Sequence, residues 1–229
     1  MRGNIRVQMF RRAARRCLLR AVASSLYALA LAVPLSVAAR QSDAELERFH
    51  RVDEVLKLLD ARPGAVIADV GAGEGFFTVP IARAVVPGGR VIAEDIDEKA
   101  LAKLRQRADR EHVENVEVVL GTVDDPRLPA QLDAAIIHNA YHEMTAHEAI
   151  LTRIRESLRP GGRLLLIEPM HESSRGLPRE KQEANHDIEI GLVEGDLRAA
   201  GFEIQQRDVD FVKFKGVAGS FWLLLARRP

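Results

Sequence analysis

The chain has little cysteine and no net charge, and each absence excludes a class of protein. Its 229 residues contain one cysteine, Cys17, in an N-terminal extension, so the rest of the chain has neither disulfides nor thiolate metal ligands. Lysine plus arginine equals aspartate plus glutamate, at 33 each. This balance gives no argument for a nucleic acid or an acidic surface as partner, and no nucleic-acid partner is predicted. With 47% hydrophobic residues, the chain is suited to one domain with a sizeable core, plus an extension.

The N-terminal extension lacks an apolar run long enough to span a membrane. A basic block at 11–16 precedes an apolar run at 21–35, and small residues follow at 36–39. The run is shorter than the ~20 residues of a transmembrane helix. The order of basic, apolar and small residues is that of a secretory signal peptide, with cleavage after Ala38 or Ala39. We therefore predict that residues 1–39 are a signal peptide or membrane-targeting segment, that the protein is exported to the periplasm, and that no stable span remains. The alternative is an over-extended start codon and a cytoplasmic protein.

The folded domain is predicted to begin at residue 42, with an amphipathic helix that ends near Leu59. After it, short apolar runs bounded by turns alternate with helical segments, as in an α/β protein with a parallel sheet. The predicted strands are 65–70, 90–97, 116–120, 132–138, 163–168, 203–211 and 217–227, and the predicted later helices are 98–110, 146–158 and 191–200. Residues 169–185 show no clear period and predict a loop or short helix over a pocket.

The first strand leads into a glycine-rich turn and a helix, which is a nucleotide-binding arrangement. The spacing of the glycines decides between ligands. A dinucleotide fingerprint would place its third glycine at position 76, where this chain has Phe76. The third glycine comes one residue earlier, at Gly75. A nicotinamide-dependent oxidoreductase is therefore the alternative, and the glycine spacing counts against it.

The segment Asp69-x-Gly71-x-Gly73-x-Gly75 resembles motif I of the class I S-adenosylmethionine (SAM)-dependent methyltransferases. The segments 91–95 and 158–166 are similar to later motifs of the same family, so the resemblance extends from about residue 66 to 168. It implies a Rossmann-like, doubly wound sheet of seven mostly parallel strands with an antiparallel C-terminal edge hairpin. It also implies SAM as the cofactor and a small molecule as the methyl acceptor.

The resemblance gives roles to the residues of the first two motifs. Gly71, Gly73 and Gly75 would admit the amino-acid end of SAM, while Asp69 would order the loop. Asp95, at the end of the second strand, would accept hydrogen bonds from both ribose hydroxyls.

The residues after the third strand would flank the adenine. Asp124 or Asp125 would accept a hydrogen bond from its exocyclic amine. The alternative for these two acids is a turn stabilised by their side chains before Pro126.

The segment 138–144 carries the most reactive side chains of the chain. In a doubly wound sheet it lies where the strand order reverses, so it borders the transferred methyl group. We predict that His138 contacts the cofactor, and that His142, assisted by Tyr141, takes a proton from the acceptor. A structural role for these residues is the alternative. His142 and His147 are spaced one residue too far apart for a zinc helix, so no metal site is predicted.

The predicted segment over the pocket, residues 169–185, and the residue after it form a predicted cap. Five of its side chains could contact the acceptor, namely His171, Glu172, Arg175, Arg179 and His186. The alternative is a solvated loop. The sequence as a whole predicts a SAM-dependent methyltransferase. A further alternative is a non-catalytic protein of the cell envelope that binds SAM or S-adenosylhomocysteine.

Overall fold

The computed structural model describes residues 47–229, so the predicted signal segment and the start of the first helix lie outside the described residues. Residues 51–229 form one compact unit, and the fold below is that of this unit. Within the described part of the chain, no helix combines the length and the apolar character needed to cross a bilayer.

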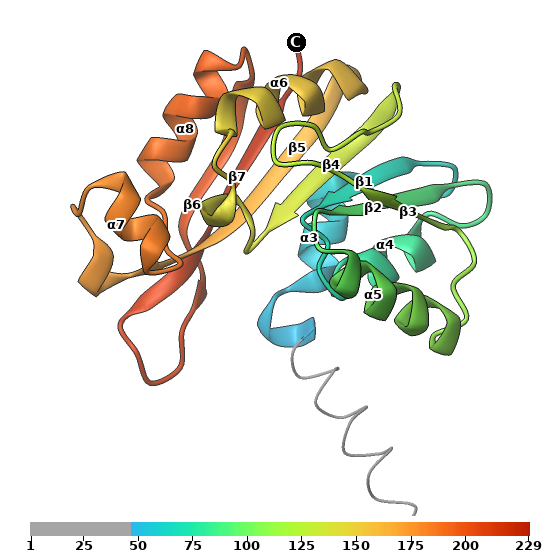
Figure 1. Cartoon of the computed structure of the whole chain (residues 1–229), viewed down its shortest axis with the longest axis horizontal. Coiled ribbons are helices and arrows are strands. Elements are labelled where there is room, and N and C mark those ends of the chain that lie inside the picture. The colour runs from blue at the N-terminus through green and yellow to red at the C-terminus, as the bar shows by residue number, and fades with distance from the viewer. Residues whose placement is uncertain (1–46) are drawn as a thin grey trace, which may run out of the picture. The chain divides into compact units, whose positions relative to one another are not determined.

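Seven strands form one sheet in the order β3-β2-β1-β4-β5-β7-β6 (Figure 1). The strands are β1 Val66–Val70, β2 Arg90–Asp95, β3 Val116–Leu120, β4 Leu132–His138, β5 Leu158–His171, β6 Glu203–Lys213 and β7 Gly219–Arg227. β1 to β5 are paired in parallel, whereas β7 is antiparallel to both β5 and β6. This topology confirms the predicted fold, including the antiparallel hairpin at the C-terminal edge.

Helices cover both faces of the sheet (Figure 1). They are α3 Val52–Leu59, α4 Thr78–Ala84, α5 Glu98–Arg110, α6 His147–Ser157, α7 Arg179–Ala184 and α8 Ile190–Ala199. α3, α4 and α5 lie on one face, and α6 and α8 lie on the other. Because both faces are covered, the central strands can be apolar without interruption, and the apolar residues of β1 and β4 are almost all buried.

Several boundaries differ from the predicted ones, and β5 begins at Leu158 where the sequence predicted residue 163. Arg51 adopts a positive φ of 53°, which interrupts the first predicted helix and starts α3 at Val52. β5 continues past Glu168 to His171 because it pairs with β7 as far as His171 and Gly219. The predicted loop at 169–185 therefore begins as sheet, and it also contains the six-residue helix α7.

Candidate functional site

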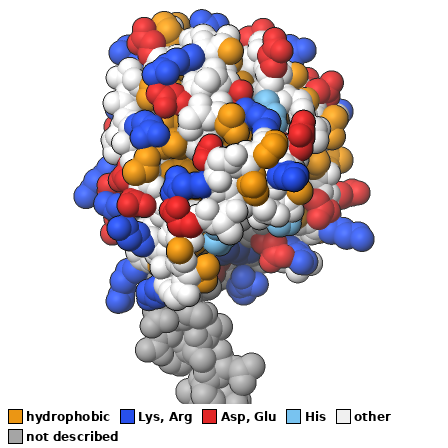
Figure 2. Space-filling view, turned by 90° about the vertical axis from the view of Figure 1, so that its left-hand side faces the viewer, with side chains coloured by type: hydrophobic (Ala, Val, Ile, Leu, Met, Phe, Trp, Pro, Cys, Tyr) orange, Lys and Arg blue, Asp and Glu red, His pale blue; other side chains and the backbone are white. Residues whose placement is uncertain are grey.

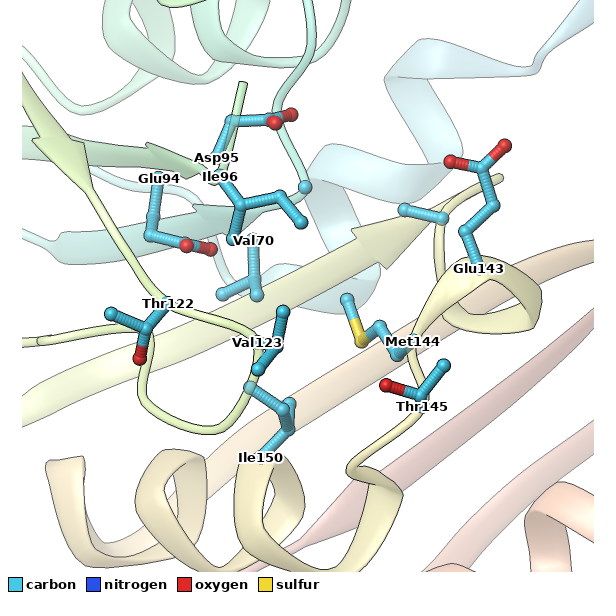
Figure 3. Close-up of a pocket in the computed structure, with 12 residues that line it drawn as sticks. Val70, Glu94, Asp95, Ile96, Thr122, Val123, Glu143, Met144, Thr145 and Ile150 are labelled. Carbon is cyan, nitrogen blue, oxygen red and sulfur yellow. The ribbon is translucent and has the colours of Figure 1, made fainter. Parts of the chain in front are cut away.

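A pocket lies at the carboxyl ends of β1 and β2, beside the loops that follow β3 and β4 (Figure 3). Its lining residues are Val70, Gly71, Glu94, Asp95, Ile96, Thr122, Val123, Ala140, Glu143, Met144, Thr145 and Ile150. β1 and β4 are neighbours at the centre of the sheet, where the strand order reverses. Open α/β sheets bind their ligands at this switch point.

The glycine loop after β1 forms one wall of this region. Gly71, Gly73 and Gly75 all have positive φ, at 71°, 53° and 84°, which side chains other than glycine rarely adopt. A Cβ atom on Gly71 would lie 2.6 Å from the Cβ of Ala140, so Gly71 lets the loops after β1 and β4 approach each other. No atom lies within 4 Å of a Cβ built on Gly73, so its backbone faces open space. The loop thus leaves room for a ligand beside Gly73.

Asp69 lies under the loop and does not line the pocket. Its carboxyl is 3% exposed and accepts a hydrogen bond of 2.6 Å from the hydroxyl of Thr78, the first residue of α4. Burial raises the pKa of Asp69 to about 6, although the Thr78 hydrogen bond opposes the shift. The contact joins the end of β1 to the start of α4, as the predicted loop-ordering role requires.

Asp95 lies between the glycine loop and the start of α5. The backbone N–H of Gly73 donates to one of its carboxylate oxygens and that of Asp97 to the other, both at 2.8 Å. Each oxygen keeps a second lone pair that can accept from a ligand hydroxyl. Asp97 in turn accepts a hydrogen bond from the backbone N–H of Lys99 and so caps α5. Asp95 therefore lines the pocket with both oxygens able to accept further hydrogen bonds, and its contact with the ribose stays a prediction.

Glu94 is a pocket residue that the sequence analysis missed. Its carboxyl points into the pocket toward the loop that carries Thr122 (Figure 3). Burial raises its pKa to about 8, against an opposing hydrogen bond from the backbone of Gly71. A Cβ on Gly121 would fall 1.9 Å from a Glu94 oxygen, so Gly121 makes room for this carboxyl. The sequence signal that could have identified Glu94 is an acidic residue directly after the apolar run 91–93 of β2.

Asp124 and Asp125 are not among the residues that line the pocket, and their contact with the adenine stays a prediction. Asp124 accepts a hydrogen bond of 2.8 Å from the hydroxyl of Thr122. Asp125 accepts one of 2.8 Å from the backbone N–H of Arg127. Both carboxylates are used within the turn, as the alternative interpretation expected, and Thr122 and Val123 line the pocket instead.

His138, predicted to contact the cofactor, belongs to an aromatic cluster at the end of β4. Its ring stacks on those of Phe76 and Phe221, with centroids 5.8 and 5.7 Å apart, and meets Phe77 edge-on. It is absent from the pocket lining. The structure thus assigns His138 to the packing of the loop after β1 against the sheet.

Tyr141, predicted to assist catalysis, is fully buried. Its hydroxyl donates to a carboxylate oxygen of Asp196 in α8 at 2.9 Å, and Arg179 donates to the same oxygen at 2.7 Å. Burial and the charge of Asp196 raise the pKa of Tyr141 well above its usual range. A hydroxyl held in this way cannot orient an acceptor, so we correct its role to anchoring the loop after β4 to α8.

His142 is held by Glu168, a second residue that the sequence analysis missed. The Nδ1 atom of His142 lies 2.6 Å from Glu168 Oε2, and both side chains are buried. Glu168 also accepts from the backbone N–H groups of Ala140 and Tyr141, at 2.7 and 2.9 Å. Burial lowers the pKa of His142, but the hydrogen bond and charge of Glu168 outweigh it and leave the pKa raised. Because Nδ1 is occupied, Nε2 is the ring atom open to a ligand. A catalytic role for His142 stays a prediction.

The five candidate residues of the predicted cap do not form one group in the structure, because they contact different partners. The ring of His171 is paired with Asp187 at 2.8 Å, whereas Glu172 and Arg175 pair with each other on the surface. Arg179 belongs to the Tyr141 anchor, and His186 lies beside His142. On the face of the molecule that Figure 2 shows, hydrophobic side chains are scattered among charged ones of both signs.

Comparisons with known proteins identify the family to which the chain belongs. Nocamycin O-methyltransferase of Saccharothrix syringae is 34% identical over 117 residues, or 51% of this chain and 42% of that protein. A ubiquinone/menaquinone biosynthesis C-methyltransferase of Hahella chejuensis is 32% identical over 109 residues, or 47% of this chain and 44% of that protein. The chain thus spans less than half the length of these curated relatives.

The crystal structure of a SAM-dependent methyltransferase from Aquifex aeolicus has the same fold, with a TM-score of 0.67 and 20% identity over 82% of this chain and 98% of that one. A family model described as a methyltransferase domain matches residues 61–215. Because this match covers more than half of the chain, the protein belongs to the methyltransferase domain family.

Proposed function

We propose that the protein transfers the methyl group of SAM to a small-molecule acceptor. The observation that carries the proposal is that Gly71 and Asp95 line one pocket at the switch point of the sheet, with the backbone N–H of Gly73 bound to Asp95. The residues present fit this nucleoside, because Asp95 offers acceptors to two ribose hydroxyls and the open space at Gly73 leaves room for the amino-acid end. Ile96 and Val123 supply apolar walls for a base.

When bound, SAM supplies a methyl group on a sulfonium that needs no further activation. The protein's contribution is then to align the acceptor with the methyl group, for which ~7–11 kcal/mol of the barrier is available in principle. Glu143, Met144 and Thr145 form the pocket wall that follows β4, and His142 presents Nε2 next to Glu143. We propose that this side of the pocket receives the acceptor, and that His142 acts on it.

The family assignment favours methyl transfer over nicotinamide-dependent redox chemistry. Calorimetric titration of the full chain with SAM, S-adenosylhomocysteine and NAD⁺ tests the proposal. We expect binding of both sulfur nucleosides with a stoichiometry of one, and no binding of NAD⁺. Binding of NAD⁺ alone would overturn the proposal.

The variant Asp95→Ala sharpens this titration. Each charge-assisted hydrogen bond to the ribose contributes about 1.5–3 kcal/mol, or roughly tenfold to a hundredfold in affinity. Because Asp95→Ala removes two of them, the variant is expected to bind S-adenosylhomocysteine at least about a hundredfold more weakly. Asp97→Ala is the matched control, because Asp97 lies two residues away and its side chain caps α5 without lining the pocket. Equal losses in the two variants would contradict a specific role for Asp95.

We also propose that residues 1–39 direct export and that the methyltransferase domain comprises residues 42–229. The order of basic, apolar and small residues in the sequence supports this proposal. Mass spectrometry of the chain recovered from the periplasmic fraction is expected to show a loss of 38 or 39 residues. Recovery of the intact chain from the cytoplasm would contradict export.

A further inference from the structure

Three potential metal ligands meet at the edge of the pocket that we assign to the acceptor. Glu143 Oε1 lies 3.7 Å from His142 Nε2 and 3.4 Å from His186 Nδ1. The ligand atoms of all three side chains lie within 4.8 Å of one another, and no other group of this kind occurs among residues 47–229. The first two residues follow β4, whereas His186 follows α7, so only the fold brings them together.

The imidazole of His142 is already fixed in the way that a metal ligand requires. Its side chain is 2% exposed, and its Nδ1 is bound to the fully buried carboxylate of Glu168. Glu168 is held in turn by two backbone N–H groups of the loop after β4. A carboxylate on the far nitrogen is the usual partner of a metal-binding histidine, because it fixes both the ring and its tautomer. Nε2 of His142 therefore faces the cluster, and it can bind a metal once it has released its proton.

The other two ligands complete a set with one open side. The rings of His142 and His186 lie edge to face, with centroids 5.5 Å apart. The side chains of Glu143 and His186 are 65% and 73% exposed, so a molecule from solution can reach the cluster. Glu143 also lines the nucleoside pocket, and in Figure 3 its carboxylate lies at the edge of the pocket away from Thr122.

The spacing and the chemistry of the donors select the ion. Zinc binds imidazole nitrogen and carboxylate oxygen at about 2.0–2.2 Å, which in a tetrahedron separates neighbouring ligand atoms by about 3.4 Å. The separations of Glu143 Oε1 from His186 Nδ1 and from His142 Nε2, 3.4 and 3.7 Å, are close to that value. Two histidines, one glutamate and an open fourth position form the ligand set of catalytic zinc sites.

We propose that His142 Nε2, the Glu143 carboxylate and His186 Nδ1 bind a Zn²⁺ ion, whose open position takes the oxygen or sulfur of the methyl acceptor. A Zn²⁺ ion lowers the pKa of a bound hydroxyl or thiol, so the acceptor loses its proton to solvent. The resulting anion bonds to the methyl carbon of SAM while the S–CH₃ bond breaks, which leaves S-adenosylhomocysteine. A nitrogen that binds zinc cannot also accept a proton, so this role replaces the general-base role predicted for His142.

The ion site itself stands apart from the proposed function, and only its use in methyl transfer rests on that function. The test is therefore a calorimetric titration of the metal-free full chain with Zn²⁺ alone, in the absence of nucleoside and acceptor. We expect one Zn²⁺ per chain. We expect His186→Asn and Glu143→Gln each to weaken binding at least tenfold, because each removes one of three ligands.

His112→Asn is the matched control for His186→Asn. Both histidines are exposed and have nearly the same positive φ, 55° and 56°, which asparagine tolerates. The control variant is expected to bind Zn²⁺ as the unaltered chain does. Absence of stoichiometric binding, or binding that His186→Asn leaves unchanged, would overturn the metal site. Loss of nucleoside binding with intact Zn²⁺ binding would contradict the proposed function alone.

Discussion

Replacing Glu168 with alanine is expected to lower the unfolding free energy by on the order of 3–5 kcal/mol, as the loss of one partner of a buried ion pair does. The fully buried carboxylate accepts from the backbone N–H groups of Ala140 and Tyr141 and from the ring of His142. An alanine cannot accept these hydrogen bonds, and each buried donor left unpaired costs about 1–3 kcal/mol. Urea denaturation at pH 7, followed by circular dichroism, measures the change.

Glu172→Ala is the control for this variant, because Glu172 lies four residues away and its side chain is exposed. It is expected to unfold within about 0.5 kcal/mol of the unaltered chain, as surface substitutions generally do. If Glu168→Ala also remained within that range, Glu168 would not hold the loop after β4, and the fixed orientation of His142 would lose its basis.

Replacing Glu94 with glutamine is expected to change how stability depends on pH. Burial raises the pKa of Glu94 from 4.5 to about 8. The folded chain therefore holds the proton more tightly than the unfolded chain, and this contribution is complete below about pH 4.5. It is lost as the pH rises through about 8. Since one pKa unit corresponds to about 1.4 kcal/mol, the loss is on the order of 3–5 kcal/mol.

The variant Glu94→Gln is neutral at every pH, so its unfolding free energy lacks this decline. Urea denaturation at pH 5 and pH 8.5 should show that the unfolding free energy of the variant, relative to that of the unaltered chain, is higher at pH 8.5 than at pH 5. Asp69 also has a raised pKa, but it is present in both chains, so most of its own contribution cancels in the difference between them. Parallel pH profiles in the two chains would contradict a protonated Glu94.

Most of the fold could be predicted because its signals are local. The buried strands are apolar runs bounded by turns, and the parallel sheet follows from their alternation with helices. Asp95 could be placed for the same reason, since it is the acid at the end of such a run. The boundaries that depend on pairing could not be predicted. β5 reaches His171 only because β7 supplies its partner backbone.

The acceptor side of the site could be predicted only in part, because its geometry depends on contacts between distant segments. His142 was recognised as a reactive residue, but its partner Glu168 is 26 positions away. Tyr141 was predicted to assist catalysis on the acceptor. Its hydroxyl instead bonds to Asp196, which lies in the distant helix α8. Likewise, the histidine spacing excluded a local zinc helix, and His186 enters the cluster from another element.

The central claim is that this pocket binds the SAM nucleoside through Asp95. A crystal structure of the full chain with S-adenosylhomocysteine tests it most directly. We predict both ribose hydroxyls within hydrogen-bond distance of the Asp95 carboxylate, and the base between Ile96 and Val123. A nucleoside bound elsewhere on the chain, or one whose ribose avoids Asp95, would contradict the claim.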